Sequence, residues 1–382
     1  MTDSQLMRQA AFIYSSELEK HPYPADHPFN IIRAQRTREI LDSMGLLTGD
    51  GKTEVAPRPA ERIVLKKFHT GRYLHTLRDA AKGRWDAEAF GMGIGTEDCP
   101  VFDGLYEYAT LATGATLVAA QLILSGDVDV AFNPSGGFHH AGPERAAGFC
   151  YINDVALACA VLAEHRKRVL YLDVDVHHAD GVARGFYDRR DVMTMSFHQN
   201  PKTLFPGTGF ADEIGEGNGK GYCVNVPLPI GTYDQAYMEA FETIAPPLIA
   251  AYDPDVIVFE LGADALAGDP LGHLCLTNNV YARIIDYLMG LGKPILATGG
   301  GGYNVDNTAR AWALAWSVFC DADSSDDMSH AMGGVLLEST EWQPGLWDRE
   351  LAVSDAQRKT VMPAIESTIE LIRTNIFPIH GL

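Results

Sequence analysis

The chain has 382 residues, of which 46% are hydrophobic and 21% are charged. This composition is typical of a soluble globular protein with a substantial core and excludes a disordered or fibrous chain. The 30 Lys and Arg residues against 50 Asp and Glu residues give a formal net charge of −20, which disfavours direct binding of nucleic acid or of an anionic membrane.

The six cysteines form no CxxC pair and no regular framework, so a reducing compartment is indicated. The first residues lack the basic segment and apolar stretch of a secretion signal. We also find no apolar run that approaches the ~20 residues of a membrane-spanning helix. The expected location is therefore the cytoplasm, without membrane insertion.

From residue 106 to residue 298, stretches of helical periodicity alternate with short runs rich in β-branched residues. The predicted helices cover 106–124, 151–165, 234–252 (interrupted by Pro246 and Pro247) and 278–291. The predicted strands cover 128–133, 168–176, 191–198, 222–227, 255–261 and 293–298. The segments before residue 100 and after about 320 are less regular, although 351–377 has the pattern of one or two packing helices. This alternation predicts an α/β fold with a parallel sheet wrapped by helices.

Polar clusters follow five of the predicted strands. They are GGFHHAG (136–142), DVHHAD (175–180), the segment 197–209, GADALAGDP (262–270) and GGGGYN (299–304). Ligands of open α/β sheets bind at the carboxyl ends of the strands. The clusters therefore predict a single site at that edge of the sheet.

Two of these clusters contain candidate metal ligands. In an extended strand, Asp175 and His177 project from the same face, close enough to hold one ion. Asp264, after another predicted strand, is the candidate third ligand. Three protein ligands leave a coordination position for water, as in catalytic sites.

Candidate catalytic groups accompany these ligands. His139 and His140 offer a general base and a second partner, while Asp173 and Asp180 are available to orient the two imidazoles. Tyr303, after a run of glycines, is a candidate phenol donor to a carbonyl oxygen that gains negative charge. A lone histidine or a glycine run before a tyrosine is more often structural, and a DxDxHH run can equally be a polar strand end. Together, however, the five clusters supply the complementary parts of one hydrolytic mechanism.

The ordered motifs GGFHHAGPERAAGFCYIND, RVLYLDVDVHHADGVARGFYD, VMTMSFH, FPGTG, GADALAGDPLG and GGGGYN resemble those of the zinc-dependent histone deacetylases. The resemblance runs from about His27 to Trp312. The form GFCYIND resembles the class I enzymes and the bacterial acetoin-utilisation proteins more closely than the acetylpolyamine amidohydrolases.

The resemblance implies an arginase/deacetylase fold with an eight-stranded parallel sheet flanked by helices on both faces. It also implies one deacetylase domain over residues 1–382, with catalytic motifs within 98–312 and a C-terminal helical extension over about 320–382. The implied metal ligands are Asp175, His177 and Asp264, with Zn2+ as the expected ion and Fe2+ as an alternative. His140 paired with Asp180 would be the general base and then acid. His139 paired with Asp173 would act electrostatically, and Tyr303 would polarise the carbonyl.

Further positions match the family's substrate tunnel, its cation sites and its internal channel. The implied substrate-binding residues are the tunnel walls and rim: Asp98, Gly137, Phe149, Phe205, Leu271 and Gly301. The neighbourhood of Asp98 departs from the family pattern by one extra residue. A first K+ or Na+ site would use Asp173, Asp175, His177, Ser196 and the carbonyl of Phe197, and a second would use Phe186, Arg189, Val192 and Tyr222. Arg33 matches the arginine of the internal acetate channel, although a salt-bridged core residue is an equal alternative.

The resulting hypothesis is metal-dependent hydrolysis of the acetyl amide of N-ε-acetyl-lysine in proteins or peptides, in a bacterial cytoplasm. One alternative is a deacylase of small molecules such as acetylpolyamines, with the same mechanism. A binuclear manganese ureohydrolase would need further carboxylates near the metal. An inactive binding module is disfavoured because no expected catalytic position is substituted. The sequence leaves the oligomeric state open.

Overall fold

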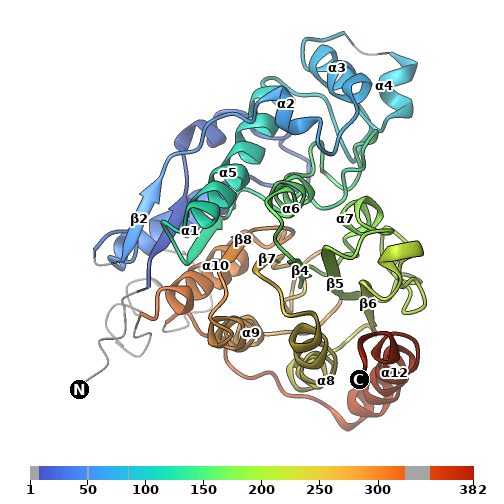
Figure 1. Cartoon of the computed structure of the whole chain (residues 1–382). Coiled ribbons are helices and arrows are strands. Elements are labelled where there is room, and N and C mark those ends of the chain that lie inside the picture. The colour runs from blue at the N-terminus through green and yellow to red at the C-terminus, as the bar shows by residue number, and fades with distance from the viewer. Residues whose placement is uncertain (1–7, 50, 85, 323–344) are drawn as a thin grey trace.

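Eight strands form one sheet in which every neighbouring pair is parallel, in the order β2-β1-β3-β8-β7-β4-β5-β6 (Figure 1). This computed structural model describes residues 8–49, 51–84, 86–322 and 345–382. The strands are β1 (Ala10–Ile13), β2 (Lys52–Val55), β3 (Val130–Asn133), β4 (Val169–Asp173), β5 (Val192–Gln199), β6 (Cys223–Leu228), β7 (Val256–Glu260) and β8 (Ile295–Thr298).

Helices cover both faces of the sheet, because successive strand residues point to opposite sides. Leu170 and Leu172 of β4 belong to a core with residues of α1 (Ile32–Ser43), α8 (Asp234–Tyr252), α9 (Asn279–Gly290), α10 (Val305–Phe319) and α12 (Asp355–Asn375). Val169 and Tyr171 of the same strand belong to a second core with residues of α5 (Leu105–Ser125), α6 (Asp154–Glu164) and α7 (Asp180–Gly185). The predicted α/β architecture with a parallel sheet is confirmed.

The six predicted strands are present, but two more were missed. β1 has four residues, and β2 at the sheet edge reads Lys-Thr-Glu-Val, so neither shows the apolar alternation of a longer strand. Backbone pairing with β1 is what makes 52–55 a strand. The ends of strands are also the least certain part of a sequence-based prediction. The strand predicted over 168–176 is β4, which ends at Asp173.

The expectation of irregular structure before residue 100 was wrong in part. Besides α1, this region forms α2 (Arg62–Leu65), α3 (Gly71–Ala80) and α4 (Ala87–Gly91), which lie together at the top of Figure 1. Helix α3 buries Tyr73, Leu74 and Leu77 in a third apolar core. These residues and Ala80 recur at helical spacing, so the sequence carried a signal for α3 that was overlooked.

The expected interruption of 234–252 was also wrong, because α8 continues through Pro246 and Pro247. Buried neighbours on both sides of the prolines, including Ile244 and Leu248, anchor the helix against the core. The expectation that no apolar run approaches the length of a spanning helix was wrong for α5, which is long and apolar enough to cross a membrane. However, 67% of its most apolar window is buried inside the protein, as expected of a core helix.

At the C-terminal end, α12 packs against α8 and β6, and a short 3-10 helix, η3 (Phe377–His380), follows it. Two other short 3-10 helices are η1 (Ser16–Glu19) and η2 (Gly217–Gly219). Within the predicted extension of about 320–382, residues 323–344 lie outside the described part of the chain.

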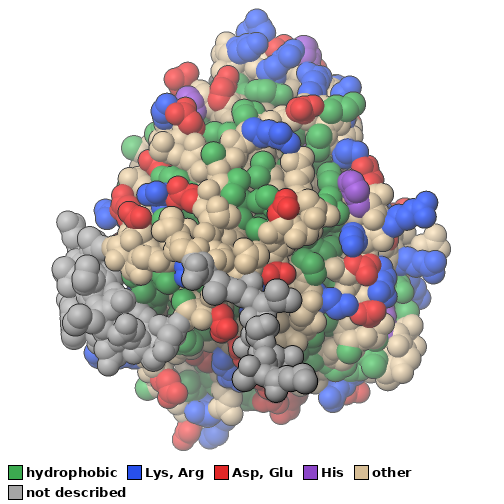
Figure 2. All heavy atoms as spheres, turned by 60° about the vertical axis from the view of Figure 1, so that its left-hand side comes forward, with side chains coloured by type: hydrophobic (Ala, Val, Ile, Leu, Met, Phe, Trp, Pro, Cys, Tyr) green, Lys and Arg blue, Asp and Glu red, His purple; other side chains and the backbone are tan. Residues whose placement is uncertain are grey.

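Charge is unevenly distributed over the surface. Figure 2 shows acidic and basic side chains mixed over much of one face, with Lys and Arg gathered at the tip formed by the α2–α4 region. Residues 58–84 contain eight Lys and Arg against two Asp and Glu, in a chain of net charge −20. The acidic balance therefore belongs to the rest of the molecule.

Candidate metal centre and active site

The loops at the carboxyl ends of four neighbouring strands, β3, β8, β7 and β4, supply the metal-ligand and catalytic side chains of the site. The loop after β3 carries the histidine pair, and the loop after β4 carries Asp175 and His177. Asp264 follows β7, and Tyr303 follows β8. The sheet thus brings together four segments that span residues 136–304, at the edge where the sequence predicted a site.

Asp175, His177 and Asp264 form a buried cluster in which one ligand atom of each lies within 4.8 Å of the others. His177 Nδ1 is 3.0 Å from Asp175 Oδ1 and 3.0 Å from Asp264 Oδ2. A Cβ atom on Gly301 would lie 1.9 Å from Asp264 Oδ2, so the glycine leaves this cradle free. One nitrogen and two carboxylate donors that converge in this way fit Zn2+ or Fe2+.

The electrostatics of the cluster also favour a cation. Burial disfavours a charged imidazole, yet Asp175 and Asp264 raise the pKa of His177 to about 10. Burial and the neighbouring Asp175 raise the pKa of Asp264 to about 7. A proton on His177 thus bridges two buried carboxylates, and a divalent ion would replace it, because metal binding releases protons from its ligands.

The predicted extended geometry of Asp175 and His177 was wrong, because β4 ends at Asp173 and the next residues bend. Each aspartate turns the chain by accepting a backbone hydrogen bond two residues ahead. Asp175 N donates to Asp173 Oδ1 (2.8 Å), and His177 N donates to Asp175 Oδ1 (2.9 Å). Such short-range acceptance is characteristic of Asp and competes with strand pairing.

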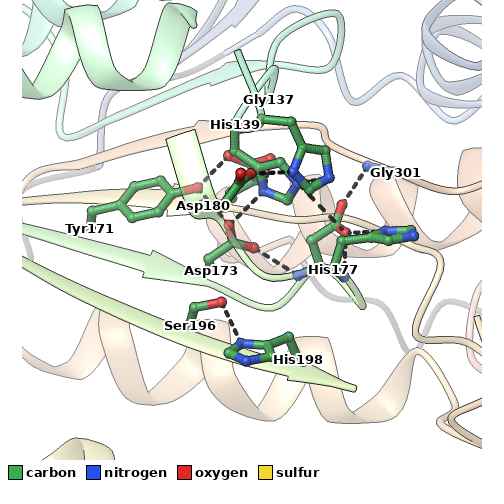
Figure 3. A network of polar contacts seen from close by, with 12 residues as sticks. Gly137, His139, Tyr171, Asp173, His177, Asp180, Ser196, His198 and Gly301 are labelled. Carbon is green, nitrogen blue, oxygen red and sulfur yellow. Dashed lines mark hydrogen bonds and ion pairs between the residues drawn. The ribbon is translucent and has the colours of Figure 1, made fainter. Parts of the chain in front are cut away.

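The two histidines lie next to the metal cluster, each with a carboxylate on its Nδ1 atom. Figure 3 shows His139 beside Asp173 and near His177. His139 Nδ1 is 2.8 Å from Asp173 Oδ2, and His140 Nδ1 is 2.8 Å from Asp180 Oδ1. The two Nε2 atoms are 3.0 Å apart. The structure therefore brings together both pairs that the sequence suggested.

The two imidazoles differ in basicity. Burial, reinforced by the nearby His139, lowers the pKa of His140 to about 4. Burial acts on His139 in the same direction, but the carboxylates of Glu260, Asp173 and Asp175 outweigh it and hold its pKa well above the usual value. The two pKa shifts run in opposite directions, so His139 holds a proton more strongly than His140 does.

Glu260, at the end of β7, is a buried member of the site that the sequence reasoning missed. Its Oε1 atom is 3.0 Å from His139 Nδ1. The phenol of Tyr171 lies 2.6 Å from Glu260 Oε2 and 2.5 Å from Asp173 Oδ2. A charged residue inside the apolar run VIVFEL was the available signal, because a carboxylate in a central strand needs a buried partner.

Asn153 and Asp154 at the start of α6 were also missed as supports of the histidine loop. Asn153 Nδ2 donates to the carbonyl oxygens of His139 (3.0 Å) and Ala141 (2.9 Å). Asp154 Oδ1 accepts from the backbone N of Phe138 (2.8 Å). The helix N-terminus thereby fixes the backbone on both sides of the catalytic pair.

Aromatic rings enclose the approach to the cluster. Phe149 and Tyr303 meet edge to face with ring centroids 5.7 Å apart, and Phe205 lies 4.9 Å from His140. Phe205 is 44% exposed, so it stands at the outer end of this wall. A narrow cavity of about 10 Å³ lies between Phe149, Tyr303, His177 and the histidine pair, large enough for about one water molecule.

The remaining predicted substrate residues occupy the rim and the floor. Asp98 is exposed, and its Oδ2 accepts from Gly148 N (3.3 Å), next to Phe149. Leu271 is half-buried on the loop after β7. Gly301 N donates to Asp175 Oδ2 (2.6 Å), and a Cβ on Gly137 would lie 2.6 Å from Gly300 N. The two glycines therefore permit close approach of backbone to the metal cluster.

The predicted monovalent cation residues fall on neighbouring strands. Asp173 of β4 is in register with Ser196 of β5, and Phe197 follows Ser196. Ser196 Oγ is 2.8 Å from His198 Nδ1 (Figure 3). For the second set, Arg189 N donates to Phe186 O, Val192 begins β5, and Tyr222 O accepts from Thr194 N. Cation binding at either place stays a prediction.

Arg33 is 4% exposed and lies against the glycine loop 299–302. Its Nη1 atom donates to Gly302 O (2.8 Å), and its guanidinium lies over the rings of Phe29 and Trp312. No carboxylate partner is recorded for it within the described residues. These contacts place Arg33 against the site, and its role in a channel stays a prediction.

Comparison with known proteins agrees with this geometry. A family model described as the histone deacetylase domain matches residues 27–319. The chain is 41% identical to the acetoin utilization protein AcuC of Bacillus subtilis over 81% of this chain and 82% of that protein. It is 38% identical to the histone deacetylase RPD3 of Saccharomyces cerevisiae, over 80% of this chain and 71% of that protein. The match covers only 61% of the rice histone deacetylase 3.

Solved structures show the same fold. The crystal structure of an HDAC homolog complexed with SAHA superposes with a TM-score of 0.86 at 32% identity, covering 96% of this chain and all of that one. The crystal structure of an HDAC homolog from Aquifex aeolicus gives a TM-score of 0.84, covering 95% of this chain and all of that one. The arginase/deacetylase fold is thereby confirmed, and the chain belongs to the histone deacetylase family of hydrolases.

Proposed function

We propose that this protein hydrolyses the acetyl amide of N-ε-acetyl-lysine in proteins or peptides, with a single divalent metal ion, Zn2+ or Fe2+, held by Asp175, His177 and Asp264. The observation that carries the proposal is the pair of buried histidines beside this cluster, each with a carboxylate on its Nδ1 atom and with their Nε2 atoms 3.0 Å apart. One such histidine can act as a general base and the other can stabilise developing negative charge, and amide hydrolysis uses both roles.

When bound, the metal ion would polarise the acetyl carbonyl and lower the pKa of the attacking water. His140 Nδ1–H donates a hydrogen bond to Asp180 Oδ1, so the basic lone pair of His140 lies on Nε2. His140 would take a proton from the attacking water and later give it to the departing lysine amine. His139, whose pKa the neighbouring carboxylates raise, would be the more readily protonated of the two and would stabilise the negative charge that develops in between.

Tyr303 supplies the remaining donor. Burial and the nearby carboxylates of Asp264 and Asp175 raise its pKa well above the ordinary value, so it stays a phenol. Its O–H group is then available to donate to the acetyl oxygen as negative charge forms there. The aromatic rings of Phe149 and Phe205 would sheathe the four methylenes of the lysine side chain.

The test is turnover of an acetyl-lysine peptide and of acetylputrescine by the purified protein with defined metal. We expect turnover of the peptide and at least a ~100-fold loss in His140→Ala. His75→Ala, which changes an exposed histidine of α3, is the matched control and should keep full activity. Turnover confined to acetylputrescine would instead establish a small-molecule deacylase.

Metal analysis tests the mononuclear centre separately. We expect one transition ion per chain, and two manganese ions per chain would contradict the proposal.

The six cysteines are all free, which supports a further proposal that the protein works in a reducing compartment such as the cytoplasm.

A further inference from the structure

The phenol of Tyr303 is carried by a loop that has little stiffness of its own. Residues 299–302 are four consecutive glycines, and Gly300 and Gly302 have φ values of 140° and 128°. Glycine adopts many backbone conformations, so such a loop does not fix the following residue by itself. The position of Tyr303 must therefore be set by contacts to other segments.

Hydrogen bonds hold this loop almost residue by residue. Gly301 N donates to Asp175 Oδ2, and Gly302 O accepts from Arg33 Nη1 (2.8 Å). The backbone N of Tyr303 donates to Asp269 Oδ2 at 2.7 Å. The first two hydrogen bonds hold residues that precede Tyr303, whereas the third holds the backbone of Tyr303 itself.

Asp269 belongs to the loop after β7, five residues beyond Asp264, and is 9% exposed. Its second oxygen, Oδ1, accepts from the backbone N atoms of Leu271 (2.9 Å) and Gly272 (3.2 Å). One carboxylate thus connects a metal-ligand loop, a residue at the rim and the loop of the phenol. Hydrogen bonds to an ionised acceptor are roughly twice as strong as neutral ones.

The ring of Tyr303 has weaker restraints. It meets Phe149 and His177 edge to face at centroid distances of 5.7 and 6.4 Å. Such contacts limit where the ring lies but do not fix the backbone from which it projects.

We propose that Asp269 is a positioning residue that fixes Tyr303 relative to the metal cluster and couples the phenol to the rim at Leu271. The catalytic readout of this inference rests on the proposed deacetylase function. The structural readout does not, because the position of a side chain can be observed without turnover.

The kinetic test is a double-mutant cycle of Asp269→Asn and Tyr303→Phe on the zinc-loaded protein with an acetyl-lysine peptide. Asparagine keeps the shape of aspartate, but its NH2 group cannot accept the hydrogen bonds that one carboxylate oxygen accepts. We expect kcat to fall about 10- to 100-fold while KM changes less than about 2-fold, because a displacement near 1 Å has effects of that size.

In the Tyr303→Phe background, Asp269→Asn should change kcat by less than about 2-fold, since the group that it positions is gone. An equal loss in both backgrounds would overturn the proposal and assign Asp269 a general structural role. Asp234→Asn is the matched control: Asp234 also accepts from a loop backbone, at Thr277 N (2.8 Å), but contacts no residue of the site. It should leave kcat unchanged.

The activity-independent test is 19F NMR of 3-fluorotyrosine incorporated at position 303 alone. We expect one narrow resonance in the zinc-loaded protein and in Asp234→Asn, and a shifted and broadened or split resonance in Asp269→Asn. An unchanged resonance in Asp269→Asn would overturn the positioning role. If the parent protein fails to hydrolyse the peptide, the NMR result still decides the positioning role and only the proposed function is lost.

If Asp269→Asn is unfolded by circular dichroism, Asp269→Ser takes its place, because a serine hydroxyl can accept one of the backbone hydrogen bonds. The same two readouts and the same outcomes then apply.

Discussion

Replacing Glu260 with glutamine should stabilise the metal-free protein at alkaline pH. Glu260 is fully buried, and one phenol proton of Tyr171 lies between its Oε2 atom and Asp173. Tyr171 can donate to only one of the two carboxyl groups. The other carboxyl group is therefore best accommodated in its protonated form, which can donate to the phenol oxygen. Glutamine matches that need, because its Nε2 can donate to the phenol oxygen of Tyr171.

The magnitude follows from the pKa of the carboxyl group. Burial, with Asp173 nearby, raises the pKa of Glu260 from 4.5 to about 8. A carboxyl group whose pKa is raised by folding binds more protons in the folded state than in the unfolded state. Its contribution to the free energy of unfolding is therefore fully present below pH 4.5 and is lost as the pH rises towards 8. The loss from pH 4.5 to pH 8 is about 4 kcal/mol. Glutamine does not titrate, and Glu260→Gln should therefore escape that loss.

The assay is urea unfolding of the chelator-treated protein at pH 5 and pH 8. The free energy of unfolding of Glu260→Gln relative to the parent should rise between these pH values by several kcal/mol, about 4 at most. Glu242→Gln, at an exposed glutamate paired with Arg283, is the control and should show no comparable pH dependence. A difference between Glu260→Gln and the parent that is the same at both pH values would refute the reasoning.

Three further outcomes are expected. Tyr303→Phe should lower kcat by about 100- to 1,000-fold, as loss of one donor to a developing oxyanion does, with metal content unchanged by elemental analysis; an unaltered kcat contradicts its role. Asp264→Ala should abolish stoichiometric zinc binding in equilibrium dialysis, while Asp269→Asn should retain it; full zinc binding by Asp264→Ala would remove Asp264 from the ligand set. Burial lowers the pKa of His69 to about 4, so its contribution to stability is present above about pH 6.5 and is lost as the pH falls towards 4. His69→Gln should reduce the acid destabilisation by up to about 3 kcal/mol in urea unfolding between pH 7 and pH 4.5, and parallel curves for the two proteins would contradict this.

The sequence predicted the fold class and the five polar segments at the strand ends because both depend on local pattern. Alternation of strands and helices follows from apolar periodicity, and polar clusters at strand ends follow from parallel architecture. The triad of Asp175, His177 and Asp264 was predicted because these residue types are metal donors in the expected places, and the structure places them together. The resemblance to a known family pointed to the same residues.

Other features depended on contacts that no local pattern contains. Strand β2 exists because it pairs with β1, and the turn after Asp173 exists because aspartate oxygens accept nearby backbone N–H groups. Glu260 was overlooked because its partner His139 lies 121 residues earlier in the chain. Asp269 was overlooked for the same reason, since it acts on the backbone of Tyr303.

The sequence by itself thus determined which residue types are available for the chemistry and which strand ends carry them. Only the tertiary structure decided the strand order β3-β8-β7-β4, in which β7 and β8 enter between strands that precede them in the chain. That order places Glu260 against His139 and Asp269 against Tyr303. The physical reason is that strand order is set by packing of both sheet faces against helices, whereas each strand's own sequence records only that it is buried.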